Sequence, residues 1–173
     1  MKIWLSTGLT VFAIGTGILV APGTAMAGLI ETKNVWVVNA KSGKCAVPPG
    51  ADTEAVLAQY TCTSSASWYI WTRYKYYYSS TGTYYRFKNK STSECMTGSQ
   101  GSGDGVVFSY RCTSGLEQQM WTLHYNSTGY FKIRNVQSRG CMAIQGGSTS
   151  NGAKVITWPC GAWEDHYWRF VAR

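Results

Sequence analysis

The six cysteines are the residues whose type and spacing indicate the clearest chemistry in this 173-residue chain. They fall into three successive pairs, whose members lie 17, 17 and 19 residues apart. Six cysteines allow many pairings by count alone, but each pair belongs to one copy of a motif that occurs three times. In the chain-entropy model, a disulfide closing each such loop stabilises a fold by about 3 kcal/mol. We therefore predict one disulfide inside each copy, namely Cys45–Cys62, Cys95–Cys112 and Cys141–Cys160.

Each copy of this motif begins with an asparagine and ends with a tryptophan. The asparagine stands six residues before the first cysteine, and a serine or threonine stands three residues before it. An aromatic residue lies two positions before the second cysteine, and Trp71, Trp121 or Trp168 follows eight or nine positions after it. The first cysteines are 50 and then 46 residues apart. A fixed period of this kind indicates one supersecondary unit used three times.

Carboxylates that could act in catalysis occur as two close pairs, Asp52 with Glu54 and Glu164 with Asp165. Glycoside hydrolysis needs two carboxylates that face each other across a cleft, about 5–9.5 Å apart. Adjacent residues on a strand point to opposite faces of a sheet, which disfavours Glu164 with Asp165. Disulfide pairing of every cysteine removes a thiol nucleophile. We therefore predict that the chain is not an enzyme.

Metal and cofactor chemistry also finds little support in the sequence. Only two histidines occur, His124 and His166, and neither lies in a metal-binding or serine-elbow motif. The glycine-rich segment Gly98–Gly105 lacks both phosphate-binding spacings. We expect no bound metal and no cofactor.

The first 27 residues have the pattern of a secretory signal peptide. Lys2 is followed by a mainly apolar stretch, and Ala25-Met26-Ala27 fits a small-x-small cleavage site. A membrane anchor is the alternative, but the stretch is short and contains glycines and Pro22. We predict a secreted protein whose domain spans residues 28–173. No second apolar stretch of spanning length follows, so we expect no membrane span in the mature form.

Lysine and arginine outnumber acidic residues and give a formal net charge of +8. They are scattered along the chain, which favours a charged, soluble surface over a basic binding tract. A preference for acidic glycans or cell surfaces is a weaker alternative. Nucleic acid is not an expected partner, because the chain has no recognised nucleic-acid motif and carries an export signal.

Short strand-like runs separated by turn-rich segments dominate the chain, which predicts an all-β fold. Two hairpins are expected, one around residues 79–83 and one around residues 126–129, each with a glycine that can adopt a positive φ. One such unit cannot bury its own apolar face. Three units packed about an axis can share one core, and we place them at about residues 35–78, 84–125 and 130–171.

At the level of motifs, the chain resembles the ricin-type lectin domains. Gln119-Met120-Trp121 is a Gln-x-Trp motif, and the segment Gly140–Cys160 is similar to a repeat of that family. The resemblance covers about residues 35–171 and implies a β-trefoil of three four-stranded repeats that binds carbohydrate. Tyr69 and His166 stand where the other two repeats would have the glutamine. The resemblance also implies that the three tryptophans of this motif are core residues.

The resemblance implies sugar sites built on the aromatic residue two positions before the second cysteine. An aromatic ring suits this role because a pyranose presents C–H groups on one face and hydroxyls at its rim. The residues at these positions are Tyr60, Tyr110 and Trp158. We expect Trp158 in repeat three to form the main site and Tyr110 in repeat two the next.

The family's sugar sites also use an aspartate two residues after the first cysteine, which accepts hydrogen bonds from sugar hydroxyls. Val47, Thr97 and Ala143 occupy these positions, so no repeat has the usual acid. Nearby polar side chains are the candidate replacements. They are Asn151, Asp165, His166 and Gln145 in repeat three, Gln118, Gln119 and Asp104 in repeat two, and Asp52 and Glu54 in the repeat-one loop.

Two functions remain open at this point. The first is a small secreted lectin, expected to be monomeric, with up to three weak sites that gain avidity on multivalent glycans. The second is a secreted trefoil that has lost sugar binding and contacts a protein, as an inhibitor or a toxin-associated subunit. The aromatic residues favour the first function, and the missing aspartates favour the second.

Overall fold

The computed structural model describes residues 28–50, 54–64, 66–78, 82–101 and 105–173. The segment predicted to be a signal peptide lies outside these residues. Within them the fold is all-β, with twelve strands and four short 3-10 helices. No helix in the described part is long and apolar enough to cross a membrane.

The element order repeats the same four strands three times, with a 3-10 helix before every fourth strand. Repeat one comprises β1 (Gly28–Asn39), β2 (Cys45–Val47), β3 (Ala58–Tyr60), η1 (Ser67–Tyr69) and β4 (Trp71–Tyr78). Repeat two comprises β5 (Gly82–Asn89), β6 (Cys95–Gly98), β7 (Val107–Tyr110), η2 (Glu117–Gln119) and β8 (Trp121–Tyr125). Repeat three comprises β9 (Phe131–Asn135), β10 (Cys141–Ile144), η3 (Gln145–Gly147), β11 (Val155–Trp158), η4 (Glu164–His166) and β12 (Trp168–Ala172).

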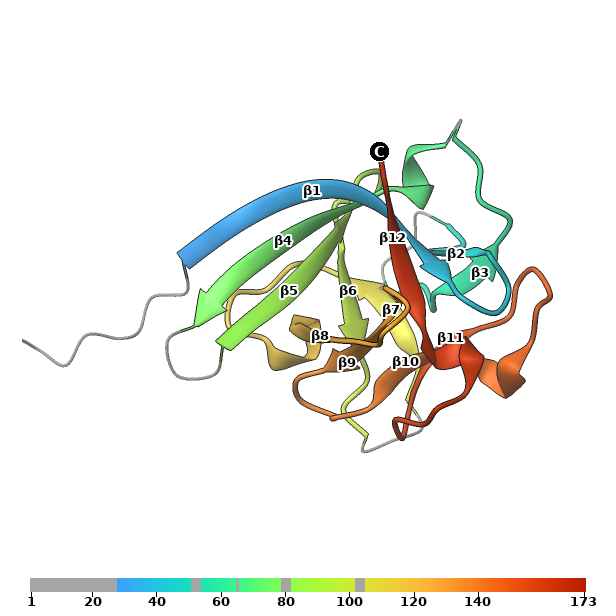
Figure 1. Cartoon of the computed structure of the whole chain (residues 1–173). Helices are drawn as coiled ribbons and strands as arrows, with labels where there is room; N and C mark the ends of the chain where they lie inside the picture. Colours follow the sequence, from blue (N-terminus) through green and yellow to red (C-terminus); the bar gives the residue numbers. More distant parts are fainter. Residues whose placement is uncertain (1–27, 51–53, 65, 79–81, 102–104) are drawn as a thin grey trace, which may run out of the picture.

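Six of the strands close into a barrel. β1, β4, β5, β8, β9 and β12 pair antiparallel in that order, and β12 pairs back onto β1 (Figure 1). β1 is longer than its sequence pattern predicted, because residues from Gly28 onward continue to pair with β4 beyond the barrel. Closure removes most of the unpaired strand edges that an open sheet would expose.

The other six strands form three hairpins, β2–β3, β6–β7 and β10–β11, one in each repeat. Single bridges join each hairpin to the other two, through Val56 with Phe108, Ala58 with Lys154, and Val106 with Ile156. The three hairpins therefore form a triangular cap on one end of the barrel. This architecture is a β-trefoil and confirms the predicted fold.

The tryptophan of each repeat lies at the centre of the core and is fully buried. Each indole Nε1 donates a hydrogen bond to a carbonyl one residue after the first cysteine of its own repeat. The pairs are Trp71 with Ala46 at 2.8 Å, Trp121 with Met96 at 3.1 Å, and Trp168 with Met142 at 2.8 Å. Each ring therefore fills the barrel and also joins it to a cap hairpin, so the predicted core role is confirmed.

The repeated asparagines explain why the motif begins with this residue. Each Oδ1 accepts hydrogen bonds from the backbone N–H groups two and three residues later, which shapes the turn before the first cysteine. Each Nδ2 donates to a 3-10 segment of the preceding repeat around the ring. The pairs are Asn39 with the Asp165 carbonyl, Asn89 with the Trp68 carbonyl and Asn135 with the Gln118 carbonyl, each at 2.8 Å.

All three predicted disulfides are present, and each lies inside one repeat. The bonded cysteines have Cα atoms 5.2, 5.0 and 5.0 Å apart. Each bond joins the first strand of a cap hairpin to the loop that follows the second strand. The disulfides therefore fix the loops that lead into the 3-10 helices.

Replacing Trp121 with alanine should lower the free energy of unfolding by about 3–5 kcal/mol, because a fully buried indole leaves a cavity and an unpaired Met96 carbonyl. Urea denaturation of the oxidised protein measures this loss. Trp163→Ala is the control, since that ring is 58% exposed and should change stability little. Equal losses in the two variants would contradict the assigned core role.

Candidate functional site

A hollow of about 750 Å³ lies in repeat three between the β10–β11 hairpin and η4. Two tryptophans line it and remain accessible to solvent: Trp158 is 42% exposed and Trp163 is 58% exposed. Trp158 ends β11, and Trp163 immediately precedes η4. Large aromatic side chains exposed around a hollow make it the first candidate for a binding site.

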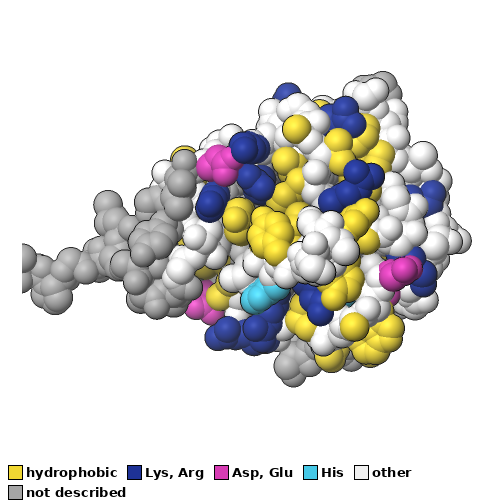
Figure 2. Space-filling view, viewed as in Figure 1, with side chains coloured by type: hydrophobic (Ala, Val, Ile, Leu, Met, Phe, Trp, Pro, Cys, Tyr) yellow, Lys and Arg dark blue, Asp and Glu magenta, His cyan; other side chains and the backbone are white. Residues whose placement is uncertain are grey.

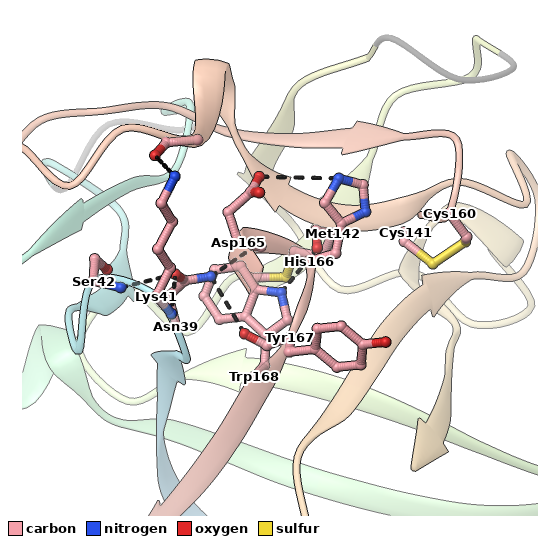
Figure 3. A network of polar contacts seen from close by, with 11 residues as sticks. Asn39, Lys41, Ser42, Cys141, Met142, Cys160, Asp165, His166, Tyr167 and Trp168 are labelled. Atoms are coloured by element: carbon pink, nitrogen blue, oxygen red, sulfur yellow. Dashed lines mark hydrogen bonds and ion pairs between the residues drawn. A yellow bond between two sulfur atoms is a disulfide. The ribbon is translucent and has the colours of Figure 1, made fainter. Parts of the chain in front are cut away.

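Asp165 gives the repeat-three hollow a carboxylate. Its residue is 8% exposed, and its backbone carbonyl accepts the 2.8 Å hydrogen bond from Asn39. This bond uses the main chain and holds η4 against repeat one, so the carboxylate stays available. Figure 3 shows Asp165 beside Lys41, with Asn39 bonded to the backbone below them.

The loop containing Gly147 brings a cation close to this carboxylate. Lys41 comes from repeat one, and its Nζ donates a 2.6 Å hydrogen bond to the Gly147 carbonyl. A Cβ on Gly147 would lie 2.9 Å from the Lys41 Nζ and 3.7 Å from the Asp165 Oδ1. A donor and an acceptor therefore face one small region of the hollow, and the glycine leaves that region open.

The position of the family's aspartate carries no carboxylate in any repeat of this fold. Val47, Thr97 and Ala143 are all buried, at 0%, 3% and 1% exposure. Ala143 lines the repeat-three hollow but has no polar side-chain atom. Asp165 supplies the acid from η4 instead of from the hairpin strand.

His166 follows Asp165 and lies below the hollow, with 3% of its surface exposed. Its Nε2 lies 3.9 Å from an Asp165 carboxylate oxygen, and its ring centroid is 5.1 Å from that of Trp163. Its Nδ1 is buried and has no hydrogen-bond partner among the described residues. Burial lowers the pKa of His166 below its usual 6.5, against the opposing effect of Asp165. His166 is therefore a neutral ring that packs beside Trp163.

A second hollow, of about 610 Å³, lies in repeat two. Tyr110, Gln118 and Thr97 line it, together with Glu54 from repeat one. Phe108 also lines it, and both rings are half-buried, whereas the two tryptophans of the repeat-three hollow are exposed.

Gln119 lies outside both hollows and is fully buried. Its Oε1 accepts the Thr113 N–H at 2.9 Å, and its Nε2 donates to the Arg111 carbonyl at 2.9 Å and to the Thr97 hydroxyl at 3.2 Å. These bonds use the amide to fasten the loop around the second cysteine. The structure therefore gives Gln119 a structural position, whereas its neighbour Gln118 reaches the hollow.

Asn151 and Tyr60 lie where repeat three contacts repeat one, and neither lines the repeat-three hollow. The Asn151 Oδ1 accepts the Thr61 N–H at 3.0 Å, which joins the long loop of repeat three to repeat one. Tyr60 is half-buried beside this junction and lines neither hollow. Both side chains lie apart from Trp158 and Asp165.

Trp163 and Lys41 line the repeat-three hollow but were not among the predicted site residues. Glu54, a candidate replacement acid in the repeat-one loop, lines the repeat-two hollow. The repeat period offers a signal for Trp163, because it stands five residues before Trp168, where repeat two has Leu116. No sequence signal places Lys41 or Glu54 in another repeat's hollow, since only the packing of the repeats brings them there.

The described residues contain no group of three or more His, Cys, Asp or Glu side chains able to hold a metal ion. All six cysteines are in disulfides. The side chains that converge in the hollows are aromatic rings, one carboxylate in each, and amide or amine donors. Such a set binds a polar ligand that has an apolar face.

Stability should fall with acid because of His166. The pKa of His166 is lower in the folded protein than in the unfolded chain, so below about pH 6.5 the unfolded chain binds more protons. The free energy of unfolding is therefore highest above about pH 6.5 and decreases as the pH falls toward the folded pKa. His166→Gln should flatten this slope between about pH 7 and pH 5. Denaturation at several pH values measures the slope. His124→Gln should flatten it less, because that ring is exposed. Identical slopes in wild type and His166→Gln would contradict this account.

Solved structures with the same fold are numerous. A designed threefold-symmetric protein, ThreeFoil, is 23% identical with a TM-score of 0.71, over 81% of this chain and 99% of that one. The hemolytic lectin CEL-III is 24% identical with a TM-score of 0.63, over 80% of this chain and 30% of that one. The Polyporus squamosus lectin, solved with a sialylated epitope, is 13% identical with a TM-score of 0.66, over 84% and 50%. The chain thus spans nearly all of the designed protein but only part of either lectin.

Among curated proteins, no sequence matches this chain closely enough to serve as a relative. A family model described as "ricin-type beta-trefoil lectin domain-like" matches residues 68–158, which is more than half of the chain. That segment contains the second cap hairpin, Trp121 and the whole repeat-three hairpin. The repeated motif, the closed trefoil and this match agree, and the chain belongs to the ricin-type β-trefoil lectin domain-like family.

Proposed function

We propose that the chain is a secreted, non-catalytic carbohydrate-binding domain whose principal site is the repeat-three hollow. The observation that carries this proposal is the pair of exposed indoles, Trp158 and Trp163, around a hollow that contains the Asp165 carboxylate. Family membership supports a glycan as the ligand.

The two indoles suit the apolar face of a sugar ring. A pyranose presents C–H groups on one face, and these pack well against an aromatic surface that is already partly desolvated. Trp158 and Trp163 come from different elements, so together they can contact more of a sugar than one ring could. Because a tryptophan side chain has only two torsions, little conformational freedom is lost when it is held against a ligand.

The polar groups of the hollow suit the hydroxyl rim of the same sugar. The Asp165 carboxylate accepts hydrogen bonds from two neighbouring hydroxyls, in the role that an aspartate on the hairpin strand has elsewhere in the family. Lys41 and Lys154 line the same hollow and can donate to ring or glycosidic oxygens. The arrangement therefore orients a sugar through hydrogen bonds while the indoles supply the contact area.

The repeat-two hollow is proposed as a weaker secondary site. It combines Tyr110 with the Gln118 amide and the Glu54 carboxylate. Weak sites on one domain gain avidity when the glycan is multivalent, because the second contact becomes intramolecular.

A protein ligand is the second candidate function. The buried Val47, Thr97 and Ala143 favour it, because the usual carboxylate of the family is missing from every hairpin. A secreted trefoil without sugar binding would use the same exposed indoles as a protein contact, since tryptophan is enriched at such interfaces.

Trp158→Ala and Trp163→Ala should each abolish detectable glycan binding while leaving the domain folded, because both rings are exposed and outside the core. A glycan array probed with the oxidised protein displayed multivalently measures this. Tyr125→Ala is the matched control, since it removes an aromatic ring that is 64% exposed and lies outside both hollows. Silence of the folded wild-type protein across the array would support the protein-binding alternative.

Asp165→Asn should weaken binding of the array-selected sugar by about tenfold, because charge-assisted hydrogen bonds are lost while the shape is kept. The thermal midpoint should stay near that of wild type, since the bond from Asn39 goes to the Asp165 main chain. Isothermal titration calorimetry measures the affinity. An unchanged dissociation constant would remove Asp165 from the site.

A further inference from the structure

A third hollow, of about 290 Å³, lies over the β8–β9 hairpin and shares no lining residue with the other two. We call it the cationic hollow, because four of its six lining residues are basic: His124, Lys132, Arg134 and Arg139. The Cys141–Cys160 disulfide completes its lining. Figure 2 shows lysine and arginine side chains gathered beside a histidine on this face of the molecule.

The strand register explains why these side chains converge. His124 on β8 lies opposite Lys132 on β9, and Thr122 lies opposite Arg134. Alternate residues of a strand point to opposite faces of the sheet, so the members of these two pairs share the outer face of the barrel. The intervening Ile133 points the other way and is fully buried. Because Ile133 packs in the core, the cationic side chains on either side of it lie on the outside of the barrel.

Two of the cations are held in place by contacts with the protein. The Arg134 Nε donates a 2.8 Å hydrogen bond to the Arg139 carbonyl, which leaves the outer guanidinium nitrogens for another partner. The Lys132 Nζ lies 5.0 Å from the centroid of the Tyr167 ring. Both contacts fix a cation without neutralising its charge.

None of the ion pairs among the described residues involves Lys132, Arg134 or Arg139. The ion pairs found there join Glu31 to Lys33 and Arg73, and Asp165 to His166. Burial, together with the positive charges of Arg134 and Lys132, lowers the pKa of His124 below its usual value. The hollow thus has a positive potential that an external anion would neutralise.

Arg139 supplies an independent observation. Its φ is +62°, in the left-handed region that side chains other than glycine adopt at a cost. The equivalent turn residue, two before the first cysteine, is Gly43 in repeat one and Ser93 in repeat two, with φ of +67° and +62°. Arg139 occupies a backbone position for which glycine is better suited. The left-handed turn is common to the three repeats, and only repeat three places a cation on it.

We propose that the cationic hollow binds an anionic oxygen group, a sulfate ester or a carboxylate, carried by an acidic polysaccharide. Planar guanidinium groups pair well with such oxyanions through parallel hydrogen bonds. The hollow is large enough for one substituted sugar, and its basic residues form a compact group rather than the long track that a nucleic acid backbone requires. This site is separate from the repeat-three hollow and does not depend on it.

The test compares two variants that each remove one positive charge. Lys132→Gln removes a cation of the hollow, whereas Lys90→Gln removes an exposed lysine in the repeat-two turn. We expect Lys132→Gln to weaken binding to a heparin oligosaccharide by about tenfold and Lys90→Gln to leave it nearly unchanged. Equal weakening would assign the binding to net charge alone and overturn the proposal.

Arg139→Gly separates binding from folding. This variant should keep or raise the thermal midpoint, because glycine relieves the left-handed backbone, and it should still weaken heparin binding by about tenfold. Wild-type affinity in a folded Arg139→Gly protein would overturn the proposal. Retained heparin binding in Trp158→Ala would show that this site acts independently of the sugar site proposed in repeat three.

Three further ligands identify the source of the anion. A desulfated heparin oligosaccharide that keeps its carboxylates should bind more weakly, in proportion to the charge removed. Inorganic sulfate alone should compete only at much higher concentration than the oligosaccharide. Sulfate binding as tight as that of the oligosaccharide would assign the hollow to a free ion. Single-stranded DNA of equal charge that binds as well, and loses affinity equally in Lys132→Gln, would assign it to nucleic acid. Either result would overturn the proposal.

Discussion

The hydrogen bond from the asparagine at the start of each repeat to the preceding 3-10 segment is the interaction on which the other features depend. Asn39, Asn89 and Asn135 are nearly inaccessible to solvent, and each amide is satisfied by a turn on one side and a neighbouring repeat on the other. A buried amide left unpaired would cost free energy, so each bond strongly favours one arrangement of two repeats. Three such bonds close the ring.

This ring also positions the proposed sugar site. Asn39 belongs to repeat one, yet it holds the main chain of Asp165 in repeat three. Lys41, two residues later, reaches the loop that borders the same hollow. The carboxylate and the amine are therefore brought together by closure of the trefoil, and the indoles of Trp158 and Trp163 complete a site that no single repeat contains.

The three repeats share their core and turn contacts but differ at positions outside the central core. The core tryptophans and the turn asparagines have the same contacts in every repeat. Five residues before the tryptophan, by contrast, stand Ala66, Leu116 and Trp163. Only the tryptophan adds a second exposed ring to a hollow. Surface chemistry can vary at this position because it lies outside the central core that the three repeats share.

Sequence patterns were enough to predict the threefold repeat, the all-β trefoil and the disulfide pairing, because period, cysteine spacing and strand patterning are local properties of the chain. They also distinguished core tryptophans such as Trp121 from the exposed Trp158. Packing of the repeats buries Gln119 while Gln118 lines a hollow, and it joins Asn151 to repeat one. Likewise, Lys41 reaches repeat three only because the ring closes. These outcomes depend on contacts between residues far apart in the chain, and local patterns carry no information about such contacts.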